Sequence, residues 1–119
     1  MKNKFNIDGN LWINKENKAF IGKGRVELLK NIQIHGSISK AAKQMKMSYK
    51  AAWDSVDIMN KLSSEPLLTK VTGGKGGGGT VITTYAKEII KAYDELTQLH
   101  KNYLSTLDNF FNDLVLDLK

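Results

Sequence analysis

The stretch from Ser37 to Asn60 constrains the fold more than any other part of this sequence. It holds two short helical patterns, and each follows a serine, Ser37 in the first case and Ser48 in the second. A serine just before a helix can accept a hydrogen bond from an unpaired N–H group of the first turn. Two short capped helices joined by a tight turn predict a helix-turn-helix.

Apolar residues recur at helical spacing in both halves of this stretch. They are Ile38, Ala41, Ala42 and Met45 in the first helix and Ala52, Val56 and Met59 in the second. Small side chains let two helices cross closely, so we expect the alanines to mark the crossing. We also expect Ala51, which is next to Ala52 in the sequence, to pack against Ala41 or Ala42 at this crossing.

A glycine-rich loop with strand-like flanks follows the second helix. Pro66 ends the helical pattern, because proline cannot continue a helix. The segments 67–71 and 80–82 then read as two antiparallel strands around Thr72–Gly79, which holds six glycines. We interpret this as the wing of a winged helix, a hairpin whose tip meets DNA phosphates through bare N–H groups and Lys75.

Three other interpretations of the loop are less well supported by its residues. A dinucleotide-binding pattern fits Gly74, Gly76 and Gly79, but so many glycines satisfy it by chance. A P-loop needs serine or threonine directly after its lysine, whereas Gly76 follows Lys75. The third interpretation is a flexible linker. The β-branched residues on both sides of the loop favour a hairpin instead.

The start of the second helix is the candidate reading surface. In a helix-turn-helix, the N-terminal residues of the second helix reach base edges in the major groove. Trp53 could instead pack against the wing, Asp54 could accept from a cytosine or orient Lys50, and Ser48 also serves as a cap. The expected base-facing residues are Ser48, Tyr49, Lys50, Trp53 and Asp54.

The N-terminal third reads as a short β segment and a helix. Phe5 with Ile7, and Leu11 with Ile13, alternate between turn-forming clusters, so residues 4–21 predict a small hairpin or strand pair in which Trp12 is a packing residue. The segment 25–35 lies between glycines and predicts a helix packing under the helix-turn-helix.

A long heptad pattern occupies the C-terminal third. From Ile82 to Leu114, apolar residues recur at alternating spacings of four and three. Thr83 or Thr84 could cap the helix. Such a seam predicts a helix that packs on its own domain at first and on a second copy further along. The expected dimer-interface residues are Ile89, Tyr93, Leu96, His100, Tyr103 and Leu107.

The expected fold class is therefore mainly α with a small β-hairpin. A winged helix-turn-helix DNA-binding domain would span residues 1–82, and a long C-terminal dimerisation helix would span residues 83–119 in the same structural unit. A length of 119 residues fits one domain of this kind.

The net charge of +6 is unevenly distributed along the chain. Residues 1–80 hold 14 lysines and arginines against 6 acids, whereas residues 81–119 hold 4 against 6. A basic N-terminal part favours a polyanion partner, although surface lysines also serve solubility. The residues expected at phosphates are Lys40, Lys43, Lys46, Thr72, Gly73, Gly74 and Lys75.

Several functional classes find no support in the sequence. It contains no cysteine, and no cluster of metal ligands, paired carboxylates or nucleophile with a base, so we expect no metal, no cofactor and no enzyme activity. Its apolar runs are too short for a signal peptide or a membrane span. We therefore expect a cytoplasmic protein without membrane contact.

Two segments carry a family resemblance. GSISKAAKQMKMSYKAAWDSVDIMN (36–60), followed by LLTKVTGGKGGGGTVIT (67–83), resembles the N-terminal DNA-binding domain of ModE, the molybdate-responsive transcriptional regulators. LysR-type regulators are similar more distantly. The resemblance implies a winged helix-turn-helix with a helical dimer interface. Members of that family continue into molybdate-binding Mop domains, and this sequence ends at Lys119, so we do not expect it to bind molybdate.

The sequence thus favours a dimeric transcriptional regulator that binds a palindromic site on double-stranded DNA. The alternatives are a winged-helix module for protein–protein interaction and a non-specific, nucleoid-type DNA binder.

Overall fold

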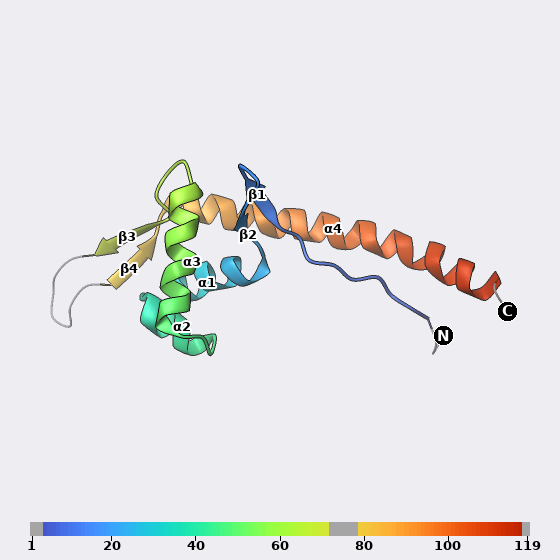
Figure 1. Ribbon diagram of the computed structural model, residues 1–119, viewed down its shortest axis with the longest axis horizontal. Coiled ribbons are helices and arrows are strands. Elements are labelled where there is room, and N and C mark those ends of the chain that lie inside the picture. The colour runs from blue at the N-terminus through green and yellow to red at the C-terminus, as the bar shows by residue number, and fades with distance from the viewer. Residues whose placement is uncertain (1–3, 72–78, 118–119) are drawn as a thin grey trace.

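The computed structural model describes residues 4–71 and 79–117 and shows a small helical body from which one long helix extends (Figure 1). Its principal extents are 68 × 30 × 21 Å. The expected mainly α fold with a small β-hairpin wing is confirmed. The elements in chain order are β1 (Ile13–Lys15), β2 (Lys18–Ile21), α1 (Lys23–His35), α2 (Ile38–Gln44), α3 (Tyr49–Leu62), β3 (Leu68–Val71), β4 (Gly79–Ile82) and α4 (Thr84–Asp117).

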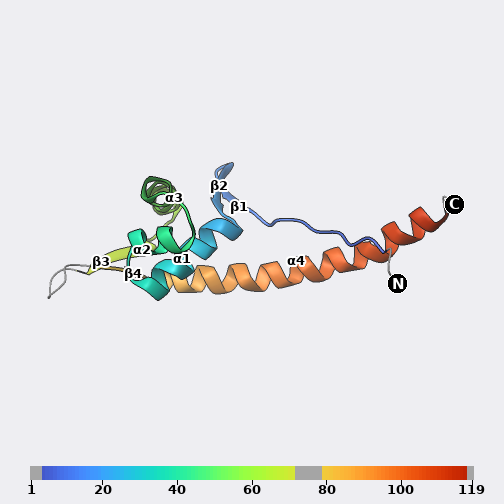
Figure 2. The same cartoon turned by 90° about the horizontal axis from the view of Figure 1, so that it is seen from below.

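Helix α1 forms the centre of the hydrophobic core. It contacts α2, α3, β4 and α4, and its Leu28, Leu29 and Ile32 are almost completely buried. Each such side chain contributes about 1.5–3 kcal/mol through burial. Figure 2 shows the result, with α3 on one side of α1 and α4 on the other. The core therefore separates α3 from α4. The face of α3 that points away from α1 is exposed to solvent.

The first turns of α4 belong to this core. Ala86, Ile90 and Tyr93 are buried there, whereas the helix beyond them leaves the body. The side chain of Thr83 caps α4 by accepting a hydrogen bond from the Ala86 N–H group at 3.1 Å, which confirms one of the two expected caps. The same hydroxyl donates to the Pro66 carbonyl at 2.8 Å and so ties the start of α4 to the turn before β3.

Residues 4–12 form an extended arm alongside α4 (Figure 1). The expected strand character of Phe5 and Ile7 is wrong, because side chains of α4 take up the backbone groups that a sheet would pair. Asn112 accepts from the Phe5 N–H at 2.8 Å and donates to the Phe5 carbonyl at 2.9 Å. Asp108 accepts from the Ile7 N–H at 2.6 Å.

The N-terminal hairpin forms just after the arm. β1 and β2 are antiparallel, and the two residues between them, Glu16 and Asn17, both have positive φ. The hairpin expected within residues 4–21 therefore forms, with its turn at Glu16 and Asn17. Among the described residues, none of the helices is both long enough and apolar enough to span a membrane.

Candidate nucleic-acid interface

The two predicted serine caps open α2 and α3. The Ser37 hydroxyl accepts from the Lys40 N–H, and the Ser48 hydroxyl accepts from the Ala51 N–H, both at 3.0 Å. Between the helices, Lys46 has a φ of +56°, which bends the chain sharply. Both caps are confirmed, and they fix where α2 and α3 begin.

Alanines at the crossing of α2 and α3 bring the helices close together. Ala41 and Ala42 on α2 and Ala52 on α3 are at most 2% exposed. The expectation for Ala51 is wrong, since its side chain faces solvent. The reason is helical periodicity, because Ala52, Val56 and Met59 form the inward stripe and Ala51 lies about 100° away from Ala52 around the helix.

Removing the Ser48 cap should destabilise the domain measurably. We expect Ser48→Ala to lower the free energy of unfolding by about 1 kcal/mol, because the Ala51 N–H loses its acceptor. Urea denaturation followed by circular dichroism measures this. Ser39→Ala, at an exposed position of α2, is the matched control and should stay within about 0.5 kcal/mol of the wild type. Equal losses in both variants would contradict the capping role.

The outer face of α3 begins with two aromatic residues and an ion pair. Tyr49 and Trp53 are about half exposed. The Lys50 ammonium lies 2.9 Å from the Asp54 carboxylate, and the hydrogen bond and charge of Asp54 raise the pKa of Lys50 above its ordinary value. In the free protein Asp54 is thus paired with Lys50, the residue that it is expected to orient.

A second ion pair follows on the same outward line of α3. The Lys61 ammonium lies 2.9 Å from Asp57, and this hydrogen bond and charge raise the pKa of Lys61. Sequence reasoning did not select Asp57 and Lys61, although their i,i+4 spacing was a usable signal. The Lys50–Asp54 pair lies in the N-terminal half of α3, and the Asp57–Lys61 pair lies in its C-terminal half.

Three basic residues precede α3 in the sequence, on α2 and in the turn that follows it. Lys40 and Lys43 of α2 are exposed, and so is Lys46 in the turn. They are the lysines that the sequence assigned to phosphate contacts.

The wing is tied to the helix-turn-helix by one backbone hydrogen bond. The Thr80 N–H of β4 donates to the Gly36 carbonyl, between α1 and α2, at 2.8 Å. A Cβ atom at Gly79 would come within 2.9 Å of the same carbonyl oxygen, so glycine permits this approach. β3 and β4 pair from Leu68–Ile82 to Val71–Gly79, as expected of a hairpin. The tip residues Thr72, Gly73, Gly74 and Lys75 lie outside the described residues.

The expected interface residues of α4 separate into two groups. Tyr93 is buried and donates to the Leu11 carbonyl at 2.8 Å, while Ile89, His100 and Leu107 are half-buried. His100 lies against the arm near Gly9. Leu96 and Tyr103 are exposed, and so are further apolar residues on that side. We call this set the apolar stripe of α4: Leu96, Leu99, Tyr103, Phe110 and Leu114, which are 43–66% exposed.

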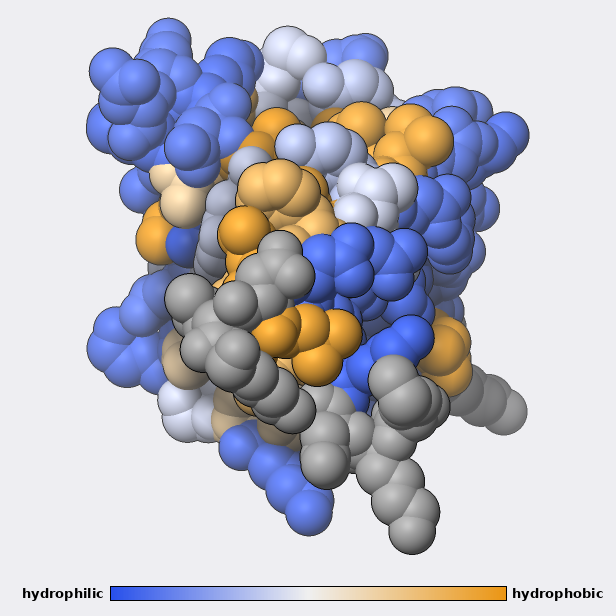
Figure 3. Space-filling model, turned by 90° about the vertical axis from the view of Figure 1, so that its right-hand side faces the viewer, coloured by the Kyte–Doolittle hydropathy of each residue, from blue (hydrophilic) through white to orange (hydrophobic). Residues whose placement is uncertain are grey.

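Figure 3 looks onto the end of the molecule toward which α4 extends, and hydrophobic surface gathers there between hydrophilic flanks. Phe5 of the arm packs edge-on against Phe111 at 5.5 Å between ring centres and leaves part of its ring exposed. The far half of α4 thus carries apolar surface that residues 4–71 and 79–117 leave exposed.

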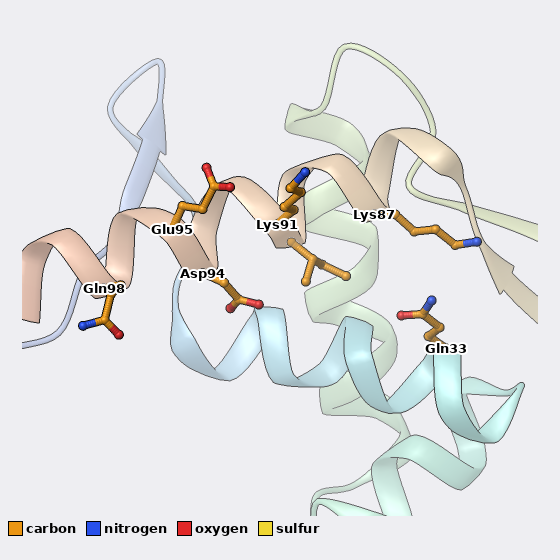
Figure 4. Close-up of a pocket in the computed structure, with 7 residues that line it drawn as sticks. Gln33, Lys87, Lys91, Asp94, Glu95 and Gln98 are labelled. Carbon is orange, nitrogen blue, oxygen red and sulfur yellow. The ribbon is translucent and has the colours of Figure 1, made fainter.

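A shallow, open cavity of about 540 Å³ lies on α4 beside the C-terminal part of α1 (Figure 4). Polar and charged side chains surround Ile90 there, and Lys30 of α1 forms an ion pair with Asp94 at 3.1 Å. Because α4 lies across α1 from α3, this cavity is not part of the helix-turn-helix surface. Among residues 4–71 and 79–117, no group of three metal-ligating side chains is found.

Comparison with known proteins identifies relatives over most of the chain, although no family model matches it. The transcriptional regulator ModE of Haemophilus influenzae is 53% identical over 92 residues, which cover 76% of this chain and 36% of that protein. The DNA-binding transcriptional dual regulator ModE of Escherichia coli (strain K12) is 42% identical over 99 residues, covering 83% of the chain and 38% of that protein.

The molybdenum transport protein ModE of Azotobacter vinelandii is 43% identical over 90 residues, covering 76% of this chain and 33% of that protein. The chain therefore spans about a third of the length of these relatives. Three-quarters or more of the chain aligns in each case, so the similarity covers the helix-turn-helix body as a unit. The chain belongs to the ModE family, as the counterpart of its members' N-terminal domain.

Proposed function

We propose that this chain is the DNA-binding part of a transcriptional regulator and that α3 enters the major groove. The observation that carries the proposal is the exposed N-terminal half of α3, with lysines on the preceding α2 and a wing hydrogen-bonded to the same body. Relatives of the chain are named transcriptional regulators, and one of them is named DNA-binding. Helix-turn-helix proteins read bases with this part of the second helix.

Each predicted residue then has a role in this proposal. Tyr49, Lys50 and Trp53 face base edges, Asp54 directs Lys50, and Ser48 caps α3 at the groove. Phosphate contacts position such a domain without reading sequence. We assign those contacts to Lys40, Lys43 and Lys46 and to the wing tip at Thr72, Gly73, Gly74 and Lys75.

The apolar stripe of α4 supports a dimeric form of the regulator. Five large apolar side chains exposed along one side of a helix are unfavourable in water, and a second copy of the same stripe would cover them. A two-fold pair of such chains would present two copies of α3, which fits a palindromic operator. Tyr93, buried within the chain, is not part of the interface that we propose.

Selection of binding sites from a random duplex library, repeated at two salt concentrations, tests the proposal. We expect an enriched palindromic sequence and an affinity that falls steeply with salt. A steep salt dependence without any enriched sequence would instead indicate a non-specific, nucleoid-type binder. Absence of DNA binding at low salt would reject the proposal and favour a protein-interaction module.

Removing the Lys50 side chain should cost sequence discrimination. We expect Lys50→Ala to weaken binding to the selected operator by about 1–3 kcal/mol and to relax preference at one base position, as for a lysine that contacts a base edge. Fluorescence anisotropy on operator and scrambled duplexes measures both effects.

Lys61→Ala is the matched control for this prediction. Lys61 forms the same kind of i,i+4 ion pair on the same outward line of α3, but in its C-terminal half. It should keep the sequence preference of the wild type, because base readout is assigned to the N-terminal half. If the two variants lose discrimination equally, the assignment of Lys50 to base readout is wrong.

A further inference from the structure

We propose that the β1–β2 hairpin is a second phosphate-binding element that contacts the DNA backbone on the flank of α3 opposite the wing. The proposal rests on the proposed function and adds a contact that the sequence did not indicate. The ligand group is a backbone phosphate of double-stranded DNA, and the contacting groups are the Lys15 and Lys18 ammonium groups.

The first argument is the position of the hairpin. Figure 1 shows the wing strands β3 and β4 on one side of α3 and the hairpin on the other. Figure 2 shows the hairpin tip on the same side of the molecule as α3, opposite α4. β2 also contacts α3 directly. A duplex seated on α3 and the wing would therefore continue across the hairpin.

The second argument is the charge at the tip. Lys15 and Lys18 are paired directly across the two strands, and both are exposed. Like charges at directly opposite positions destabilise a hairpin, and an anion bound between them would remove that cost. Glu16 lies in the turn beside them and offsets one of the two charges, yet the structure shows no ion pair between Glu16 and either lysine among the described residues.

The third argument is the fixed position of the hairpin relative to the core. The Arg25 guanidinium of α1 donates to the Ala19 carbonyl at 2.6 Å and to the Phe20 carbonyl at 3.0 Å. It also lies 5.6 Å from the ring centre of Trp12, whose ring occupies the space where a Cβ at Gly22 would be. With Phe20 and Ile21 buried, the strands cannot swing freely, so the two lysines are presented at one place.

The experiment compares the salt dependence of binding in two double variants of the full chain. Lys15→Ala/Lys18→Ala should reduce the slope of log K against log salt by about 1–2, since each lost phosphate contact reduces it by about 0.9. Sequence preference should stay that of the wild type. Lys87→Ala/Lys91→Ala, which removes two lysines of α4 at the cavity beside α1, should keep the wild-type slope.

A charge-preserving variant separates phosphate contact from hairpin structure. Lys15→Arg/Lys18→Arg should keep the wild-type slope of log K against log salt. A reduced slope in this variant would show that the two positive charges do not produce the salt dependence, and it would overturn the inference. An unchanged slope in Lys15→Ala/Lys18→Ala, with wild-type binding intact, overturns the inference alone. If the wild type does not bind DNA, both this inference and the proposed function fail.

Discussion

Tyr103→Asp is expected to be monomeric at concentrations where the wild type is a dimer. Tyr103 lies within the apolar stripe of α4 and is 62% exposed in the single chain. In the proposed dimer it would face the same stripe of the second copy. A carboxylate without a partner in an apolar interface costs several kcal/mol, so the dimer should weaken by at least about 100-fold. Sedimentation velocity over a range of concentrations measures this.

The adjacent residue provides the control. Asn102→Asp introduces the same carboxylate one position earlier, about 100° around α4 and at an exposed site. The side chain of Asn102 accepts from Gln98, and an aspartate can accept in the same way. This variant should sediment as the wild type does. An unchanged mass for Tyr103→Asp would reject the apolar stripe as the interface.

The loss should extend to DNA binding if the operator is palindromic. A monomer presents one copy of α3 instead of two, so it gives up one set of half-site contacts and the gain from linking them. We expect Tyr103→Asp to bind the full operator about as weakly as a single half-site. Anisotropy with full and half operators distinguishes this outcome from a general loss of folding.

Ala52→Leu is expected to destabilise the helix-turn-helix by about 1–3 kcal/mol, because a larger side chain in a filled core forces neighbouring groups apart. Ala52 of α3 is completely buried in the same core cluster as Ala41 and Ala42 of α2, the helix that α3 contacts. Because the same crossing sets the position of α3, DNA binding should weaken in parallel. Urea denaturation and anisotropy measure the two losses.

The neighbouring alanine makes this test specific. Ala51→Leu places the same side chain at an exposed position of α3 and should change the free energy of unfolding by no more than about 0.5 kcal/mol. If Ala51→Leu were the more destabilising variant, Ala51 would lie at the helix crossing, as the sequence predicts, and the structure would be wrong on this point.

Local patterns sufficed for much of the fold. The caps at Ser37, Ser48 and Thr83, the end of α1 at Gly36 and the β3–β4 hairpin were all expected, since each depends on residues within a few positions of one another. Even the error at Ala51 was small. Ala51 lies about 100° around α3 from the inward stripe of Ala52, Val56 and Met59, so the helical period already separates the two alanines.

Contacts between residues that are far apart in the chain could not be predicted from the sequence. Phe5 and Asn112 are 107 positions apart, and nothing near either of them indicates that an asparagine of α4 would pair with the backbone of the arm. The heptad pattern had the same limit. It identified the apolar positions of α4, but not that Tyr93 is buried in the body and donates to Leu11 while Leu96 remains exposed.

The sequence by itself determined the helix caps, the β3–β4 hairpin and the family of this protein, because capping and turn formation depend on residues that are close together in the chain. Only the tertiary structure decided which faces stay free. It anchored the wing at Gly36, laid the arm on α4 and brought the β1–β2 hairpin to the side of α3. Those outcomes depend on how elements pack over long sequence separations, which no local pattern specifies.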